Sequence, residues 1–248
     1  MRSYYAMGLM NITERQMEIL DGVCKEYIKQ AFPISSQFLK ERQSLPYSSA
    51  TIRNEFVALE DKSYLLHPYV SSGRIPSDKG YRFFVERILK EEKFECEKED
   101  DLEEFFSEIS QIKDILKMSR EITKSFSELS SNLVLTYLPQ DNIFWREGWD
   151  RVIDEPEFQN VEYLKDFLES VRDFEKNIEK LDWEREQDVK VYIGRENPFL
   201  KNKASVIVAK VSLQKDIETF VAILGPKRMD FERNIGFLKK AAEILESF

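Results

Sequence analysis

Two short stretches in the first third of the chain carry side chains suited to contact with a nucleic acid. The first, "SSATIRN" at residues 48–54, places hydroxyl groups beside an arginine and an asparagine. Arginine can pair bidentately with guanine and asparagine with adenine, while the start of a helix suits phosphates. The second, "SSGR" at residues 71–74, offers two hydroxyls, an unobstructed backbone at the glycine and one guanidinium at a hairpin tip, which suit a DNA backbone or minor groove.

These stretches predict a set of residues that bind DNA. Arg53 and Asn54 are the candidates for reading base edges, and Thr51 with the amides of Ser48 and Ser49 suits phosphates. Basic residues in and after the second stretch are expected to contact the negatively charged phosphates of the DNA backbone. The predicted set is Ser48, Ser49, Thr51, Arg53, Asn54, Ser71, Ser72, Gly73, Arg74 and Lys79.

The surrounding pattern predicts three short helices, a hairpin and a fourth helix. Thr13 and Gln16 form a capping box, and Ser35 and Ser48 or Ser49 can cap the next two helices. Two short strands around Gly73 then precede a helix capped by Ser77. This order is that of a winged helix, in which the third helix enters the major groove. The alternative is a surface helix whose small residues only pack on a neighbour, and the basic hairpin favours DNA over it.

The rest of the chain predicts a second, α+β domain with an antiparallel sheet, because strand-like runs alternate with amphipathic helices. We expect residues 1–90 to form the DNA-binding domain and residues 91–131 an acidic linker with a long amphipathic helix over residues 101–131, for which a break near Ser119 stays open. Residues 132–248 then form the regulatory and dimerisation domain. The long helix carries more apolar residues than one narrow stripe needs, which predicts a dimer contact. The expected contact residues are Phe105, Phe106, Ile109 and Ile112.

Charge and composition narrow the function class. Residues 1–90 hold 13 basic and 10 acidic residues, whereas the whole chain has a net charge of −9, so only the first part suits a polyanion. Two distant cysteines, Cys24 and Cys96, and one histidine, His67, give no metal-ligand spacing and suit a reducing, cytoplasmic compartment. We expect no cofactor, no membrane span and no catalytic activity, since the sequence contains no recognisable catalytic constellation. His67 is assigned no role.

Several motifs together give a family resemblance. The stretches "PISSQFL", "SSATIRNEFVALE", "SSGRIPSDKGYRFFV", "EPEF", "YIGREN" and "GPKRMDF" occur in this order. With them the chain resembles the HrcA-type heat-inducible transcription repressors almost from end to end. The resemblance implies a winged helix, a GAF-like C-terminal domain, a homodimer on an inverted-repeat operator of chaperone genes, loss of activity on heat stress, and support by the chaperonin.

The chain departs from the family pattern at three places. Ser63 stands where the family favours glycine after the third helix, and "HPYVSSG" replaces a more usual "QPHTSAG". The family also has an inserted dimerisation domain after the strand ending at Pro139, where this chain has only "QDN". A different class of function stays open, in which the GAF-like domain senses a small molecule and the regulator controls another set of genes.

Overall fold

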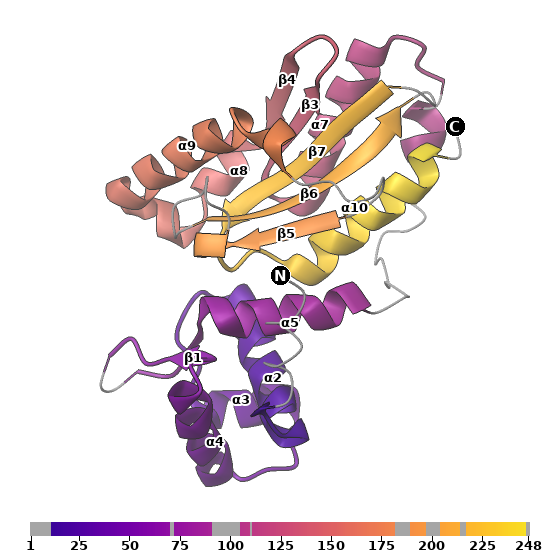
Figure 1. The fold of residues 1–248 in the computed structure, drawn as a ribbon. Coiled ribbons are helices and arrows are strands. Elements are labelled where there is room, and N and C mark those ends of the chain that lie inside the picture. The colour runs from indigo at the N-terminus through magenta and orange to yellow at the C-terminus, as the bar shows by residue number, and fades with distance from the viewer. Residues whose placement is uncertain are drawn as a thin grey trace. The chain divides into compact units, whose positions relative to one another are not determined.

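The computed structural model divides the chain into two compact units, residues 1–90 and 91–248, which are described separately (Figure 1). Together the helices and the antiparallel sheet make an α+β protein. Within the part that the structure describes, no helix combines the length and the apolar character needed to cross a membrane. The described residues are 11–69, 72–90, 105–109, 111–181, 189–196, 204–213 and 217–246.

Local sequence signals start the helices of the first unit. Thr13 forms a full capping box with Gln16, and the hydroxyls of Ser35 and Ser48 accept hydrogen bonds from backbone amides three residues on, so these three predicted caps are confirmed. Ser77 likewise accepts from the Gly80 amide, at 3.0 Å. The elements are α2 (Glu14–Gln30), α3 (Ser36–Gln43), α4 (Ser49–Asp61), β1 (Leu65–Leu66), β2 (Ile75–Pro76) and α5 (Asp78–Lys90).

The core of this unit forms where apolar stripes of α2, α4 and α5 meet, and each stripe follows the three- and four-residue spacing of a helix. Cys24 is buried in it, and this burial raises the pKa of its thiol. Ser63, which follows α4, has a left-handed backbone with φ of 63°, the conformation that glycine adopts most easily. The central buried residues are Ile19, Leu20, Val23, Ile52, Phe56, Leu59, Tyr81, Phe84 and Ile88.

The second unit is built on a five-stranded antiparallel sheet in the order β4-β3-β7-β6-β5. The strand-like runs at residues 132–139, 188–194, 204–213 and 218–225 correspond to β3, β5, β6 and β7, as predicted. β4 was not predicted; it pairs with β3 through a tight turn where the Asn142 amide donates to the Pro139 carbonyl. The strands are β3 (Leu133–Leu138), β4 (Ile143–Glu147), β5 (Val189–Ile193), β6 (Ala204–Leu213) and β7 (Ile217–Pro226).

Helices cover both faces of this sheet (Figure 1). Alternate residues of β3 point to opposite faces. Leu135 joins a core with Phe167 and Phe174 of α9, while Thr136 faces α7 and bonds to the Thr123 hydroxyl at 2.8 Å. The helical segments are α7 (Ile115–Ser130), α8 (Trp149–Ile153), η2 (Pro156–Gln159), α9 (Val161–Glu175), η3 (Ile178–Lys180), η4 (Gly194–Glu196) and α10 (Phe231–Glu246).

The long helix predicted over residues 101–131 is interrupted, but at residues 111–114 and not near Ser119. Residues 105–109 are helical, but residues 111–114 are not, and α7 starts afresh after Asp114. The carboxylate of Asp114 accepts a hydrogen bond from the Lys117 amide at 3.0 Å, which makes it an N-cap. Ser119, the predicted break, lies inside α7, where its hydroxyl accepts a hydrogen bond from the Trp145 indole at 2.9 Å.

The predicted dimer contacts also need correction. Phe106 and Ile109 are 0% and 2% exposed within a single chain, and the Phe106 ring packs against Phe126 of α7 at 6.1 Å. These two side chains fill the core of their own unit, so the structure leaves them no surface for a partner. Phe105 and Ile112 are partly exposed.

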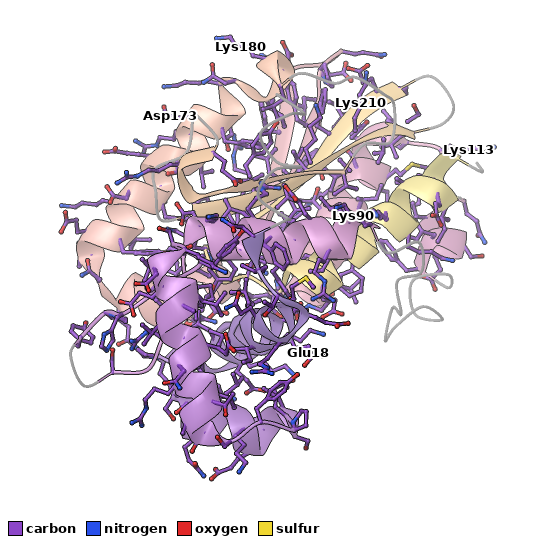
Figure 2. All side chains as sticks on the ribbon, turned by 60° about the horizontal axis from the view of Figure 1, so that its bottom comes forward. Glu18, Lys90, Lys113, Asp173, Lys180 and Lys210 are labelled. Carbon is purple, nitrogen blue, oxygen red and sulfur yellow. The ribbon has the colours of Figure 1, made fainter. Side chains whose placement is uncertain are left out.

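A buried ion cluster ties two loops of the second unit together. Arg228, in the turn between β7 and α10, is 8% exposed and donates to the carboxylates of Glu155 at 2.5 Å and Glu157 at 2.5 and 3.0 Å. By contrast, Asp173 of α9 and Lys180 of η3 are exposed, and their side chains project outward (Figure 2). The "GPKR" stretch is therefore a packed strand-to-helix turn.

Candidate nucleic-acid interface

The exposed face of α4 carries the predicted base-reading residues. Ile52, Phe56 and Leu59 are buried against the unit, so the opposite side of the helix faces solvent. Arg53 and Asn54 lie on that side and are exposed, as predicted. Val57, one turn beyond Arg53, is 48% exposed and was not among the predicted residues. Its i, i+4 spacing from Arg53 was the signal that could have identified it.

The first turn of α4 uses its hydroxyls internally. The Ser48 hydroxyl accepts from the Thr51 amide at 3.0 Å and bonds to the Thr51 hydroxyl at 2.8 Å. Ser48 is exposed, while Ser49 and Thr51 are half-buried. The three residues lie together at the helix start as predicted, and the cap fixes the backbone there.

Gly73 holds the hairpin against the loop before α3. The Ile34 amide donates to the Arg74 carbonyl at 2.9 Å, and the Arg74 amide donates back to Ile34 at 2.8 Å. A Cβ at position 73 would lie 2.3 Å from the carbonyl carbon and oxygen of Ile34. The prediction that this glycine leaves the backbone open at the hairpin tip is therefore wrong. A close approach of two backbones requires it.

Arg74 differs from the predicted free hairpin cation. Its guanidinium forms an ion pair with Glu60 of α4, with 2.9 Å between Nη2 and Oε2, and its side chain is only 13% exposed. Its Nε is buried and has no hydrogen-bond partner within the described part of the chain. Arg74 thus connects the hairpin to the C-terminal half of α4 while one donor stays unused.

The other predicted hairpin residues have local roles. The Ser72 hydroxyl bonds to the backbone of Tyr69, at 2.8 Å to the carbonyl and 3.1 Å from the amide, and so closes the turn. Ser71 lies outside the described residues. Lys79 is exposed, but its ammonium donates to the Lys62 carbonyl at 2.8 Å and lies 4.2 Å from the centre of the Tyr64 ring. It caps the C-terminal end of α4.

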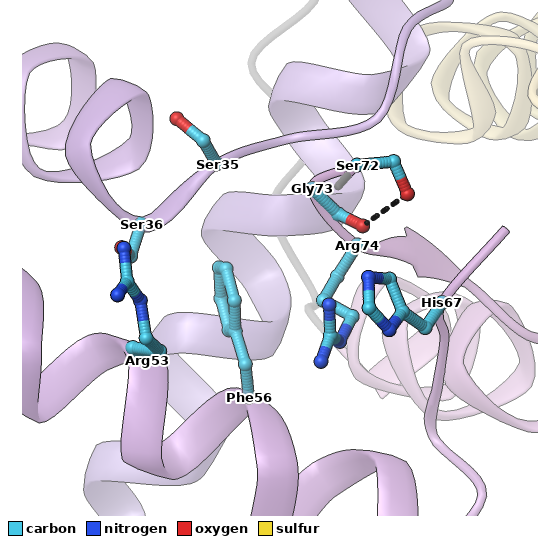
Figure 3. A pocket seen from close by; sticks show the side chains of 8 residues that line it. All are labelled: Ser35, Ser36, Arg53, Phe56, His67, Ser72, Gly73 and Arg74. Carbon is cyan, nitrogen blue, oxygen red and sulfur yellow. Dashed lines mark hydrogen bonds between the residues drawn. The ribbon is translucent and has the colours of Figure 1, made fainter. Parts of the chain in front are cut away.

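A pocket of about 410 Å³ opens between α4 and the hairpin (Figure 3). In this view the Arg74 and His67 side chains lie next to one another on the hairpin side, and Arg53 extends from α4 toward Ser36 at the start of α3. None of the described residues that line the pocket is acidic. The lining residues are Ser35, Ser36, Arg53, Phe56, His67, Ser72, Gly73 and Arg74.

Comparison with a family model gives a match over residues 84–235 to the HrcA protein C-terminal domain. Among curated relatives, a heat-inducible transcription repressor HrcA from Alkaliphilus metalliredigens is 38% identical over 132 residues, which cover 53% of this chain and 38% of that protein. Another from Oceanobacillus iheyensis is 49% identical over 78 residues, which cover 32% of this chain and 23% of that protein. The matched stretch thus spans well under half of each relative.

One solved structure has the same fold over nearly the whole chain. It is described as the crystal structure of a hypothetical protein, and it superposes with a TM-score of 0.75 at 21% sequence identity. The match covers 96% of this chain and 99% of the other. At this identity the likeness concerns the fold.

Proposed function

The chain belongs to the HrcA family, and from that premise we propose that it is a DNA-binding transcription repressor of heat-shock genes. It binds an inverted-repeat operator as a homodimer, blocks transcription by occupying the promoter, and loses activity on heat stress. Operator DNA and a second copy of the chain are its proposed partners, and the resemblance adds the chaperonin.

In this proposal residues 1–90 form a winged helix, with α4 as the recognition helix and β1–β2 as the wing, and the second unit is a GAF-like regulatory domain. The observation that carries the proposal is the exposed row of Arg53, Asn54 and Val57 on α4. These types match guanine, adenine and the thymine methyl group, respectively. None of the three side chains is needed for the core beneath, which leaves them for recognition.

The proposed phosphate contacts come from the start of α4, the wing and the start of α5. We propose that the start of α4, with Ser48, Ser49 and Thr51, lies against one strand of the DNA backbone. Gly73 and the Ser72 turn position the wing, and Lys79 adds positive charge from the start of α5. The Ser71 side chain stays a predicted contact. This set of contacts would fix the register of α4 in the major groove.

Selection of bound duplexes from a random-sequence DNA library tests this function. The full chain should enrich an inverted repeat, because a two-fold dimer places two copies of α4 about one helical turn apart or a multiple of it. Enrichment of an unrelated consensus without two-fold symmetry would contradict the homodimeric reading. No enrichment over the starting library would contradict the repressor function itself.

Replacement of Arg53 is expected to reduce specificity. Arg53→Ala should weaken binding to the selected operator by about 1–3 kcal/mol and leave binding to a scrambled duplex nearly unchanged, since a base-edge contact carries sequence information. Fluorescence anisotropy at fixed salt measures both affinities. Arg172→Ala, which removes an exposed arginine of α9, is the matched control and should change neither. An equal loss on both duplexes would remove Arg53 from base reading.

Dimerisation without DNA is expected despite the short β3–β4 turn. Two half-sites held by one dimer gain from high effective concentration, which a single winged helix lacks. The partly exposed apolar residues Phe105, Ile112 and Leu116 remain as candidates for the contact, with Leu116 37% exposed. Light scattering at micromolar concentration should give the mass of a dimer. A monomer there would show that two copies meet only on DNA.

A further inference from the structure

We infer that the pocket between α4 and the hairpin binds one phosphate of the operator backbone, with Arg74 and His67 as the donors. This inference rests on the proposed DNA-binding function and assigns a role to His67. The pocket has the chemistry that an anion needs. Arg53 and Arg74 bring two guanidiniums, His67 brings an imidazole, and none of the described lining residues carries a carboxylate.

Arg74 is already oriented for such a contact. Its pairing with Glu60 holds the guanidinium in place at 2.9 Å, and its backbone is fixed by the bridge to Ile34. A phosphate oxygen in the pocket beside Arg74 would be an acceptor of the right charge.

The geometry of a winged helix on DNA places a phosphate here. When α4 lies in the major groove and the hairpin reaches the neighbouring minor groove, the sugar-phosphate strand that separates the two grooves must pass between them. The pocket lies between these two elements, with Phe56 on the α4 side and Ser72 and Gly73 on the hairpin side (Figure 3). The hydroxyl of Ser36 lies at the far side, beside the Arg53 guanidinium.

His67 gives this pocket its own spectroscopic probe. It is the single histidine among the 248 residues, so its imidazole C–H resonances in an NMR spectrum report on this place alone. Addition of the selected operator should shift these resonances. A set of operators, each with one phosphodiester replaced by a neutral methylphosphonate, should contain one position that abolishes most of the shift. The same experiment with inorganic phosphate at matched ionic strength separates a free anion from DNA.

Affinity measurements on the same operators provide the second readout. His67→Ala should weaken binding to operator and scrambled duplexes alike by about threefold to tenfold, the equivalent of one ordinary hydrogen bond. His67→Gln, which keeps an N–H donor, should recover part of that loss. The methylphosphonate that abolishes the shift of the His67 resonances should reduce the operator affinity of the wild-type protein more than it reduces that of His67→Ala, because the two changes remove the same contact.

The outcomes separate this inference from the proposed function. If the wild-type protein prefers its operator but no methylphosphonate alters the His67 resonances, the pocket inference is wrong and the repressor function stands. A saturable shift with inorganic phosphate and none with operator would also overturn it, since the site would then hold a free anion. If the protein does not distinguish operator from scrambled DNA, the proposed function fails first.

Discussion

Arg228→Met should lower the free energy of unfolding of the second unit by about 2–4 kcal/mol. The substitution leaves the carboxylates of Glu155 and Glu157 beside one another without their shared cation. Removal of one partner from a buried ion cluster is strongly destabilising, and the partial exposure of the two glutamates, 32% and 22%, moderates the effect.

Denaturant unfolding followed by tryptophan fluorescence measures this loss. All three tryptophans of the chain, Trp145, Trp149 and Trp183, belong to residues 91–248, so the signal follows the second unit. Arg172→Met removes an exposed arginine of α9 and is the matched control, with an expected change within about 0.5 kcal/mol. If both variants unfold at the wild-type midpoint, the cluster contributes nothing to stability and this description of it fails.

Gly73→Ala should detach the hairpin from the body of the first unit. The added Cβ would lie 2.3 Å from the backbone of Ile34, so the two paired segments must separate or distort, at a cost of about 1–3 kcal/mol. We expect operator affinity to fall at least about tenfold, because the wing and Arg74 would no longer be held in position relative to α4. Anisotropy titration measures the affinity.

Hydrogen exchange localises the cause. The amides of Ile34 and Arg74 bond to one another's carbonyls, so both should lose protection in Gly73→Ala. Ser72→Ala at the neighbouring position removes the hydroxyl bonds to Tyr69 and should cost at most about 1 kcal/mol while the bridge stays protected. Unchanged protection of Ile34 and Arg74 in the glycine variant would show that the hairpin tolerates a side chain there.

Sequence signals predicted the first unit well because its elements depend on local chemistry. Caps by Thr13, Ser35 and Ser48 act within three residues, and helical spacing identifies the buried face of α4 without knowledge of its neighbours. The same spacing left Arg53 and Asn54 exposed. These inferences therefore hold without any tertiary information.

Properties that depend on distant partners could not be predicted in this way. Arg74 pairs with Glu60, fourteen residues earlier, and Gly73 meets the backbone of Ile34 from another loop. Neither contact produces a periodic pattern in the sequence. Similarly, the apolar surplus around Phe106 suggested a partner chain, but Phe126 of the same unit covers it. A pattern shows that a face is apolar and does not show what buries it.

The ratio of affinities for the selected operator and for a scrambled duplex of the same composition tests the central claim most directly. Measured by anisotropy at physiological salt with competitor-free duplexes, this ratio should be at least about 10³, the range of specific DNA-binding proteins. Both affinities should fall as salt rises, since each includes phosphate contacts. A ratio near one across the salt series would contradict the account, because α4 would then carry no sequence information.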